Sequence, residues 1–201
     1  MVMTTNGRIA DYPIDPMFLE RWSPRAFNGE PIDTEDLLTM LEAARWAASS
    51  FNSQPWRFVY ARRDTHHWAG FLDLLVPNNQ RWARDAAALV MVLSHHTGMN
   101  PRTGAEIPLP THSFDTGIAS GFFALQALRM GWFVHGMAGF DHERASNLLK
   151  VPSDYTFEAA FAVGRRSTPS KLPESLQARE HPSDRLPLKE IVFEGRLEDK
   201  S

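Results

Sequence analysis

Small polar side chains gather where a predicted helix ends and a predicted strand begins. They are Ser49, Ser50, Asn52, Ser53 and Gln54, and a Pro55-Trp56 step follows them. Hydroxyl and amide groups form many short hydrogen bonds without adding charge, so this loop could hold a planar or polyhydroxylated ligand. The same residue types are common in turns, and an ordinary loop between two elements is the alternative interpretation.

A second set of residues suits a phosphate group. Arg21, Ser23 and Arg25 alternate along the chain, so their side chains share one face if the segment is extended. Guanidinium groups and a hydroxyl are good donors to phosphate oxygens. Near the other end of the chain, Arg185 stands in the sequence SDRLP. Taken singly, each arginine is typical of an exposed surface position.

Small residues end a predicted strand at positions 136–139, which read Gly-Met-Ala-Gly. Such residues allow backbone N–H groups to approach a ligand closely. The alternative interpretation is a tight turn between a strand and a helix.

Several common catalytic signatures are missing from the sequence. Ser120 stands in GIASG, which lacks the first glycine of a nucleophile elbow, and neither glycine-rich nucleotide fingerprint is found. The absence of cysteine excludes thiol catalysis and Cys-ligated zinc. Eight histidines include adjacent pairs at 66–67 and 95–96, but no spacing typical of a metal site, so no metal ligand is predicted.

Composition narrows the class of protein further. The formal net charge of −3 provides no basic footprint for nucleic acid. No apolar run approaches the roughly 18 residues of a membrane span, and the N-terminus lacks the pattern of a signal peptide. We therefore expect a cytoplasmic protein with neither nucleic acid nor membrane as a partner. A chain of 201 residues fits one domain over 1–201, with a loose arm at 1–12 and an extended C-terminal arm at 165–201.

Hydrophobic periodicity predicts helices and strands that are interspersed along the chain. The expected strands are 57–62, 86–94, 132–137 and 157–163, and the expected helices are 17–25, 34–48, 65–75, 114–130 and 141–149. Residues 97–113 are rich in Pro, Gly, Thr and Asn and are predicted to form a loop. This order indicates an α+β sandwich with about four or five strands. The last 35 residues hold too little apolar surface for a core, so we expect a dimer with exchanged ends.

Four ordered blocks of sequence resemble the nitroreductase family of FMN-dependent oxidoreductases. They are RWSPRAF at 21–27, AASSFNSQPW at 47–56, AGFD at 138–141, and AVG followed by SDRLP at 162–187. The resemblance covers about residues 14–193. It implies a three-layer α+β sandwich, with a mixed or antiparallel central sheet flanked by helices. It also implies a homodimer with FMN at the interface and a C-terminal arm exchanged between subunits.

The resemblance also implies roles for individual residues. Arg21, Ser23 and Arg185 would contact the phosphate, and Arg25 would be the cation beside flavin N1 and O2. Ser49, Ser50 and Asn52 would reach the flavin from the partner subunit, with Gln54 nearby. Asn79 would contact the pyrimidine edge, and the backbone N–H groups of Ala138 and Gly139 would point at N5 and O4. Trp22 and Met137 complete the expected cofactor-binding set.

Three residues depart from the family pattern. Ala48 stands where many members have proline, Trp82 where some have lysine, and Ala138 where some have glutamate. The segment 97–113 is also short, and in relatives this region carries much of the substrate pocket.

The resemblance implies a reaction in two half-steps. FMN would take hydride from NAD(P)H through N5 and pass electrons to a small oxidised acceptor, of nitroaromatic or quinone type, by a ping-pong mechanism. No side chain is expected to act as a catalytic acid or base, because the flavin carries the chemistry. The alternatives are a flavin-based oxidase, dehalogenase or flavin-fragmenting relative, and a non-catalytic FMN-binding protein.

Overall fold

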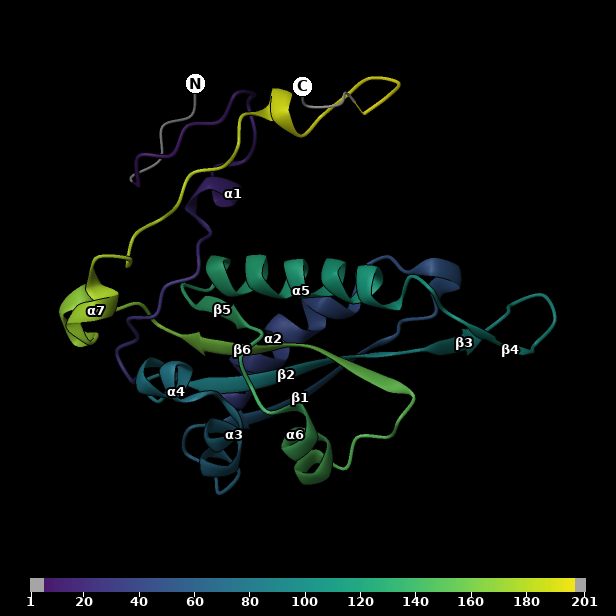
Figure 1. Cartoon of the computed structure of the whole chain (residues 1–201), viewed down its shortest axis with the longest axis horizontal. Coiled ribbons are helices and arrows are strands. Elements are labelled where there is room, and N and C mark those ends of the chain that lie inside the picture. The colour runs from purple at the N-terminus through teal and green to yellow at the C-terminus, as the bar shows by residue number, and fades with distance from the viewer. Residues whose placement is uncertain (1–5, 198–201) are drawn as a thin grey trace.

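A four-stranded antiparallel sheet forms the centre of the molecule (Figure 1). The computed structural model describes residues 6–197. The strands lie in the order β1 (Trp56–Arg62), β2 (Ala88–His95), β6 (Tyr155–Gly164) and β5 (Phe133–Met137), and each neighbouring pair is antiparallel. The predicted α+β sandwich is confirmed, and its sheet is antiparallel throughout.

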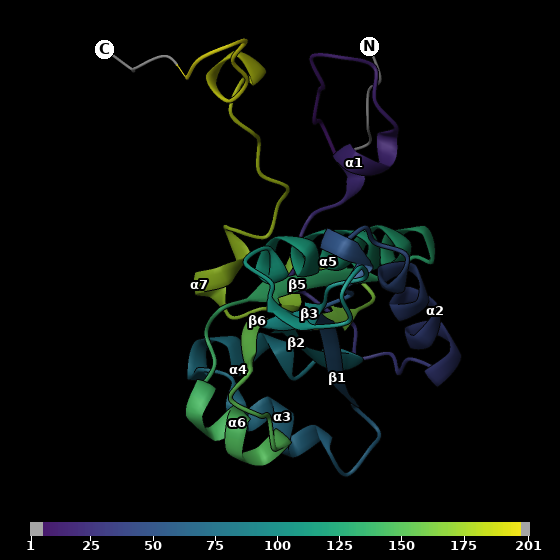
Figure 2. The same ribbon diagram turned by 90° about the vertical axis from the view of Figure 1, so that its right-hand side faces the viewer.

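Helices cover both faces of this sheet (Figure 2). On one face lie α2 (Thr34–Arg45) and α5 (His112–Arg129), and on the other lie α3 (Trp68–Leu74), α4 (Pro77–Ala83) and α6 (His142–Leu149). Side chains alternate along strand β2, so Val90 and Val92 pack toward α2 and α5, whereas Leu89 and Met91 pack toward the other layer. This arrangement explains why residues 88–94 of β2 are all buried and read as a continuous apolar run.

The helix boundaries differ from the predictions mainly at their ends. Helix α2 ends at Arg45 rather than at residue 48, and the first helix, α1 (Pro16–Glu20), ends before Arg21. The segment that follows α1 is therefore extended, as the alternation of Arg21, Ser23 and Arg25 requires. Helix α4 was not predicted; Pro77 begins it, a position where a missing backbone N–H costs nothing.

The prediction of a loop at 97–113 was wrong. Two short strands, β3 (Thr97–Met99) and β4 (Glu106–Pro108), pair as an antiparallel hairpin. The hairpin turn includes Gly104 at a φ of 67°, and its N–H donates to the Asn100 carbonyl at 2.8 Å. Strands of three residues are too short to show an alternating hydrophobic pattern, so this hairpin left no periodic signal in the sequence.

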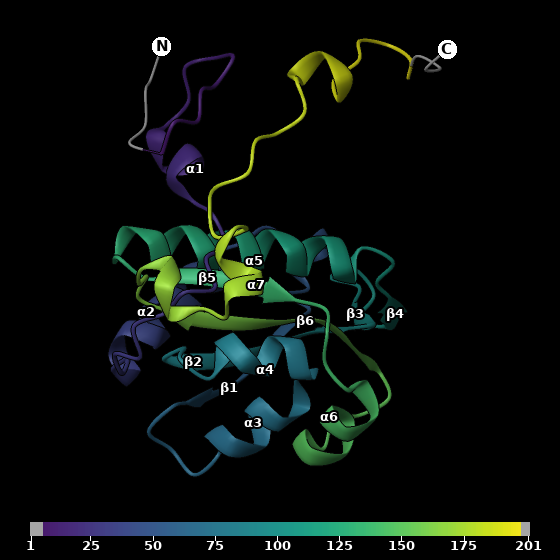
Figure 3. The ribbon, with the colours of Figure 1, turned by 60° about the vertical axis from the view of Figure 1, so that its left-hand side comes forward.

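Both ends of the described chain run outward from the body as arms (Figures 1 and 3). The N-terminal arm precedes α1. A short 3-10 turn at Pro169–Lys171 precedes α7 (Glu174–Gln177), and the C-terminal arm that follows α7 includes another at Leu188–Glu190. Residues 1–5 and 198–201 of the predicted arms lie outside the described residues. No helix in the described part of the chain is long and apolar enough to cross a membrane.

Candidate functional site

A cavity of about 410 Å³ lies where the two arms leave the body. It brings together residues from the start, the middle and the end of the chain. They are Arg8, Arg21, Trp22, Ser23, Arg25, His135, Arg179, His181, Ser183 and Arg185. We call it the arginine cavity. The predicted phosphate-binding set of Arg21, Ser23 and Arg185 is therefore assembled in one place, with Arg25 and Trp22 beside it.

The positive charges of the arginine cavity have few acidic partners. Within residues 6–197, no carboxylate forms an ion pair with Arg21, Arg25, Arg179 or Arg185. Burial, followed by the charges of Arg185 and Arg8, lowers the pKa of Arg21. Burial, followed by the charge of Arg179, lowers the pKa of Arg25, and Glu180 opposes this shift. The guanidinium groups thus repel one another, as expected of a site prepared for an anion.

Hydrogen bonds to the backbone hold the two chain segments of the cavity together. The Arg8 guanidinium donates to the carbonyls of Leu19, Arg21 and Ser183 at 2.9–3.0 Å. On the other side, one carboxylate oxygen of Glu180 accepts the N–H groups of Arg25 and Ala26, both at 2.8 Å. Arg8 and Glu180 are both buried. Arg21 and Arg25 are therefore fixed against a segment that lies about 160 positions later in the chain.

His135 forms the inner wall of the arginine cavity from strand β5. Its Nδ1 lies 3.1 Å from the Pro24 carbonyl oxygen, to which it donates a hydrogen bond. Burial, followed by the nearby charge of Arg25, lowers the pKa of His135 to about 4. The ring also packs against Trp82 with centroids 4.6 Å apart. Trp82 is only 2% exposed and belongs to the core, so it supplies no charge where some relatives have lysine.

The turn after strand β5 forms a second part of the predicted site. The Asn79 side-chain amide donates to the Gly139 carbonyl at 3.1 Å, and the Val76 N–H donates to the same oxygen at 3.0 Å. In the described part of the chain, neither the Ala138 nor the Gly139 N–H donates a hydrogen bond. Asn79 and these two N–H groups therefore lie together at the edge strand, with buried Met137 directly before them.

The polar loop at 49–54 lies elsewhere. The Ser50 N–H donates to the Asp115 carboxylate at 3.0 Å, which ties the loop to the first turn of α5. The arginine cavity is lined by His135 on β5, the strand that follows the other end of α5. With 18 residues, α5 is roughly 27 Å long. One chain therefore does not bring Ser49, Ser50, Asn52 and Gln54 to its own arginine cavity.

Sequence reasoning missed five residues of the cavity, namely Arg8, His135, Arg179, His181 and Ser183. Arg8 and His135 are isolated in the sequence and belong to no motif. Arg179 and His181 stand shortly before the SDRLP block, in a proline-punctuated stretch dense in charge, and this was the available signal. Among residues 6–197, no cluster of three His, Cys, Asp or Glu side chains is arranged to hold a metal ion.

Comparisons with known proteins identify the family. The model described as the nitroreductase family matches residues 19–75. A solved structure, the crystal structure of an oxidoreductase containing FMN, is 45% identical to this chain; the match covers 99% of this chain and 100% of that one, with a TM-score of 0.94. The chain therefore belongs to the nitroreductase family.

Two curated relatives are more distant. A provisionally named NADH dehydrogenase/NAD(P)H nitroreductase of Rhodopseudomonas palustris (strain TIE-1) is 22% identical over 152 residues, covering 68% of this chain and 76% of the relative. The 5,6-dimethylbenzimidazole synthase of Rhodospirillum rubrum is 27% identical over 180 residues, covering 80% of this chain and 85% of the relative.

Proposed function

We propose that this protein is an FMN-dependent oxidoreductase that uses NAD(P)H to reduce a small oxidised acceptor of nitroaromatic or quinone type. The observation that carries the proposal is the arginine cavity, in which Arg21, Arg25, Arg179 and Arg185 form no ion pair with any carboxylate of the described residues. When bound, FMN supplies the redox chemistry, taking hydride at N5 and passing electrons on in a ping-pong cycle. A reaction that draws on NAD(P)H favours the cytoplasm as its location.

The donor set of the cavity fits a flavin phosphate. A phosphate monoester carries close to two negative charges at neutral pH, which would offset the mutual repulsion of Arg21, Arg185 and Arg8. Arg21 Nη1 already lies 3.4 Å from Ser23 Oγ, so a guanidinium and a hydroxyl point to the same region. The crystal structure that contains FMN, with 45% identity over nearly the whole chain, supports the same cofactor here.

The remaining predicted residues supply polarity to the flavin ring. Arg25 lines the same cavity and would stabilise negative charge that accumulates at flavin N1 and O2. The free N–H groups of Ala138 and Gly139 would donate to N5 and O4, and Asn79 would hold the turn that presents them. These groups bind and orient the flavin; none of them needs to exchange a proton.

We also propose a homodimer in which each flavin lies between two subunits. Three features support it. The loop at 49–54 is separated from the arginine cavity of its own chain by the length of α5. The outer face of α5 exposes Phe114 and Phe122, with Gly117 and Gly121 between them. A cavity of about 800 Å³ between the two arms is lined partly by apolar side chains, among them Ile9, Phe18 and Ile191, beside charged ones such as Asp11. A second copy could fill this cavity and cover this helix face.

Titration with FMN and with riboflavin tests the proposal. Riboflavin has the same ring but lacks the phosphate, so FMN should bind far more tightly. Anaerobic stopped-flow mixing with NADH or NADPH should then bleach the bound flavin, and a nitroaromatic or a quinone should restore its colour. A protein that binds neither flavin, or that binds both equally, would contradict the proposed phosphate site.

The similarity to a 5,6-dimethylbenzimidazole synthase favours one alternative reaction, in which the flavin itself is fragmented. This relative is matched over a larger share of the chain than the nitroreductase of Rhodopseudomonas palustris, 80% against 68%. The two reactions differ in their products. Incubation with reduced FMN in air, followed by mass spectrometry for 5,6-dimethylbenzimidazole, separates them; formation of that product would favour the alternative.

A further inference from the structure

The loop at 49–54 holds three non-glycine residues in the left-handed backbone region. They are Phe51 and Asn52, both with a φ of 54°, and Gln54, with a φ of 49°. Elsewhere in the described chain, Lys150 is the one other non-glycine residue with a positive φ. This conformation is unfavourable for residues that carry a Cβ, most of all for a bulky side chain such as phenylalanine. Strain of this kind persists only where the surroundings impose it, and it concentrates at functional sites.

Packing within the chain does not compensate the strain at Phe51. This side chain is 56% exposed, so it gains little from burial. The loop is nevertheless well ordered by hydrogen bonds. The Asn52 and Ser53 N–H groups donate to the Ser49 and Ser50 carbonyls at 3.0 Å, and the Gln54 N–H donates to Ser49 Oγ at 3.0 Å.

Asp115 fixes this loop to the body of the protein. The residue is 4% exposed and lies in the first turn of α5. One of its carboxylate oxygens accepts the Ser50 N–H at 3.0 Å and the Thr111 hydroxyl at 3.1 Å. On the other side, a Cβ at Gly98 would come within 2.8 Å of Ser53 Oγ, so strand β3 also abuts the loop. The strained backbone is thus held from both sides.

Two polar side chains of this loop have no hydrogen-bond partner in the described part of the chain. In the described residues, neither the Ser50 hydroxyl nor the Asn52 side-chain amide forms a hydrogen bond. Both were predicted to face a flavin in the partner subunit. Groups that are fixed before binding lose less conformational entropy when the ligand arrives.

We propose that Asp115 is a positioning residue, which locks the strained loop so that Ser50 and Asn52 are arranged in advance for the FMN of the partner subunit. The inference rests on the proposed function. It assigns the FMN affinity partly to the backbone conformation of the loop, and not to its side chains alone.

A pair of substitutions at Phe51 isolates the backbone conformation. Phe51→Ala and Phe51→Gly both remove the ring, but only glycine relieves the left-handed strain. We expect FMN-free Phe51→Gly to have a Tm about 2–4 °C above that of FMN-free Phe51→Ala. We also expect Phe51→Gly to bind FMN about fivefold more weakly than Phe51→Ala, because its loop is less confined. Stability and affinity would then change in opposite directions, which a purely structural role does not produce.

A second pair tests the tether. Asp115→Ala removes the acceptor of the Ser50 N–H and should weaken FMN binding by about tenfold, whereas Asp115→Asn keeps an oxygen at that position and should restore most of the affinity. Thr111→Val is the control, because it removes the other partner of the same oxygen. Equal FMN affinity in the wild type, both Phe51 variants and Asp115→Ala would overturn the inference and leave the proposed function intact. A wild type that fails to bind FMN would overturn both.

Discussion

The guanidinium groups of the arginine cavity repel one another, which raises the electrostatic free energy of the folded protein. A bound anion would offset this repulsion. The pKa of Arg21 is lowered by burial and by Arg185 and Arg8, and the pKa of Arg25 by burial and by Arg179. Within residues 6–197, no ion pair with a carboxylate offsets this repulsion at Arg21, Arg25, Arg179 or Arg185. Here the carboxylate of Glu180 is directed to backbone N–H groups. The residues thus favour a phosphate ligand over an internal ion pair.

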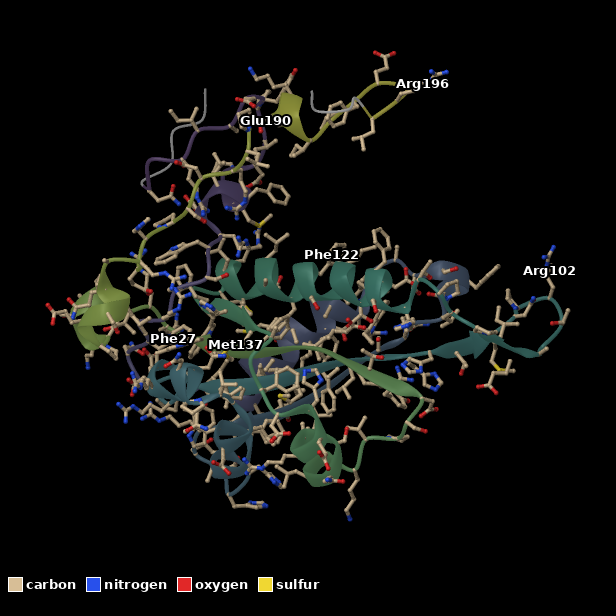
Figure 4. The ribbon with its side chains drawn as sticks, viewed as in Figure 1. Phe27, Arg102, Phe122, Met137, Glu190 and Arg196 are labelled. Carbon is tan, nitrogen blue, oxygen red and sulfur yellow. The ribbon has the colours of Figure 1, made fainter. Side chains whose placement is uncertain are left out.

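Removal of one phosphate contact should weaken FMN binding without harming the fold. Arg21→Ala or Arg185→Ala each deletes a charge-assisted hydrogen bond of about 1.5–3 kcal/mol, which lowers affinity roughly 10- to 100-fold. Arg102→Ala is the matched control, because Arg102 lies at the exposed tip of the β3–β4 hairpin (Figure 4). Calorimetric titration with FMN measures all three. Unchanged dissociation constants in both cavity variants would rule out this phosphate site.

His135 predicts how stability changes with pH. Its pKa is about 4 in the folded protein against an ordinary value of 6.5, so the unfolded chain binds the extra proton more readily. The contribution of His135 to the free energy of unfolding should therefore have its highest value above pH 6.5. It should fall by about 3 kcal/mol as the pH is lowered to 4. Denaturant titrations of the wild type and His135→Gln should show a shallower fall in the variant. His67→Gln, at an exposed position, serves as the control.

At the residue scale, the sequence allowed part of the cavity to be predicted. Arg21, Ser23 and Arg25 share a face because alternation in an extended segment is a local property. Arg8 and Arg179 were missed because their positions depend on where the two arms meet, and no local pattern encodes that. The strain at Phe51 was equally invisible, since it depends on the tether to Asp115.

At the scale of elements, long periodic segments were predicted well and short ones were not. The four central strands and helix α5 have clear patterns, because each buries a continuous stripe or both faces of a strand. Helix α4 and the β3–β4 hairpin are short and take their form from their neighbours. Helix α4, for example, is held by contacts at its first turn to the end of strand β5.

The close approach of α4 to the turn after β5 depends on Gly139. A Cβ there would lie 2.9 Å from Asn79 Nδ2 and 2.9 Å from Val76 Cγ2. Gly139→Ala should therefore displace the start of α4 and cost about 1–3 kcal/mol of stability, with a loss of FMN affinity because Asn79 moves. At Gly136 the nearest atom would be 3.4 Å away, so Gly136→Ala is the control. Thermal unfolding that does not distinguish the two variants would contradict this packing.

At the scale of the whole molecule, the predicted flavin site is divided between two places that one chain does not join. The arginine cavity and the turn after β5 lie at the edge strand, and the strained loop lies at the first turn of α5. The arms extend beyond the outer face of α5, where Phe122 points away from the sheet (Figure 4). These positions support the proposal that a second subunit completes the site.

Gly121 tests whether the outer face of α5 is that interface. A Cβ at this position would meet no heavy atom within 4 Å outside its own helix, so Gly121→Leu has room in the single chain. It should also favour the helix by about 1 kcal/mol. In a dimer that packs closely on α5, the same leucine collides with the partner, and dimerisation and FMN binding should be lost together. Sedimentation velocity and FMN titration measure the two properties, with exposed Leu148→Ala as the control. A monomeric Gly121→Leu that retains wild-type FMN affinity would show that one chain suffices to hold the cofactor.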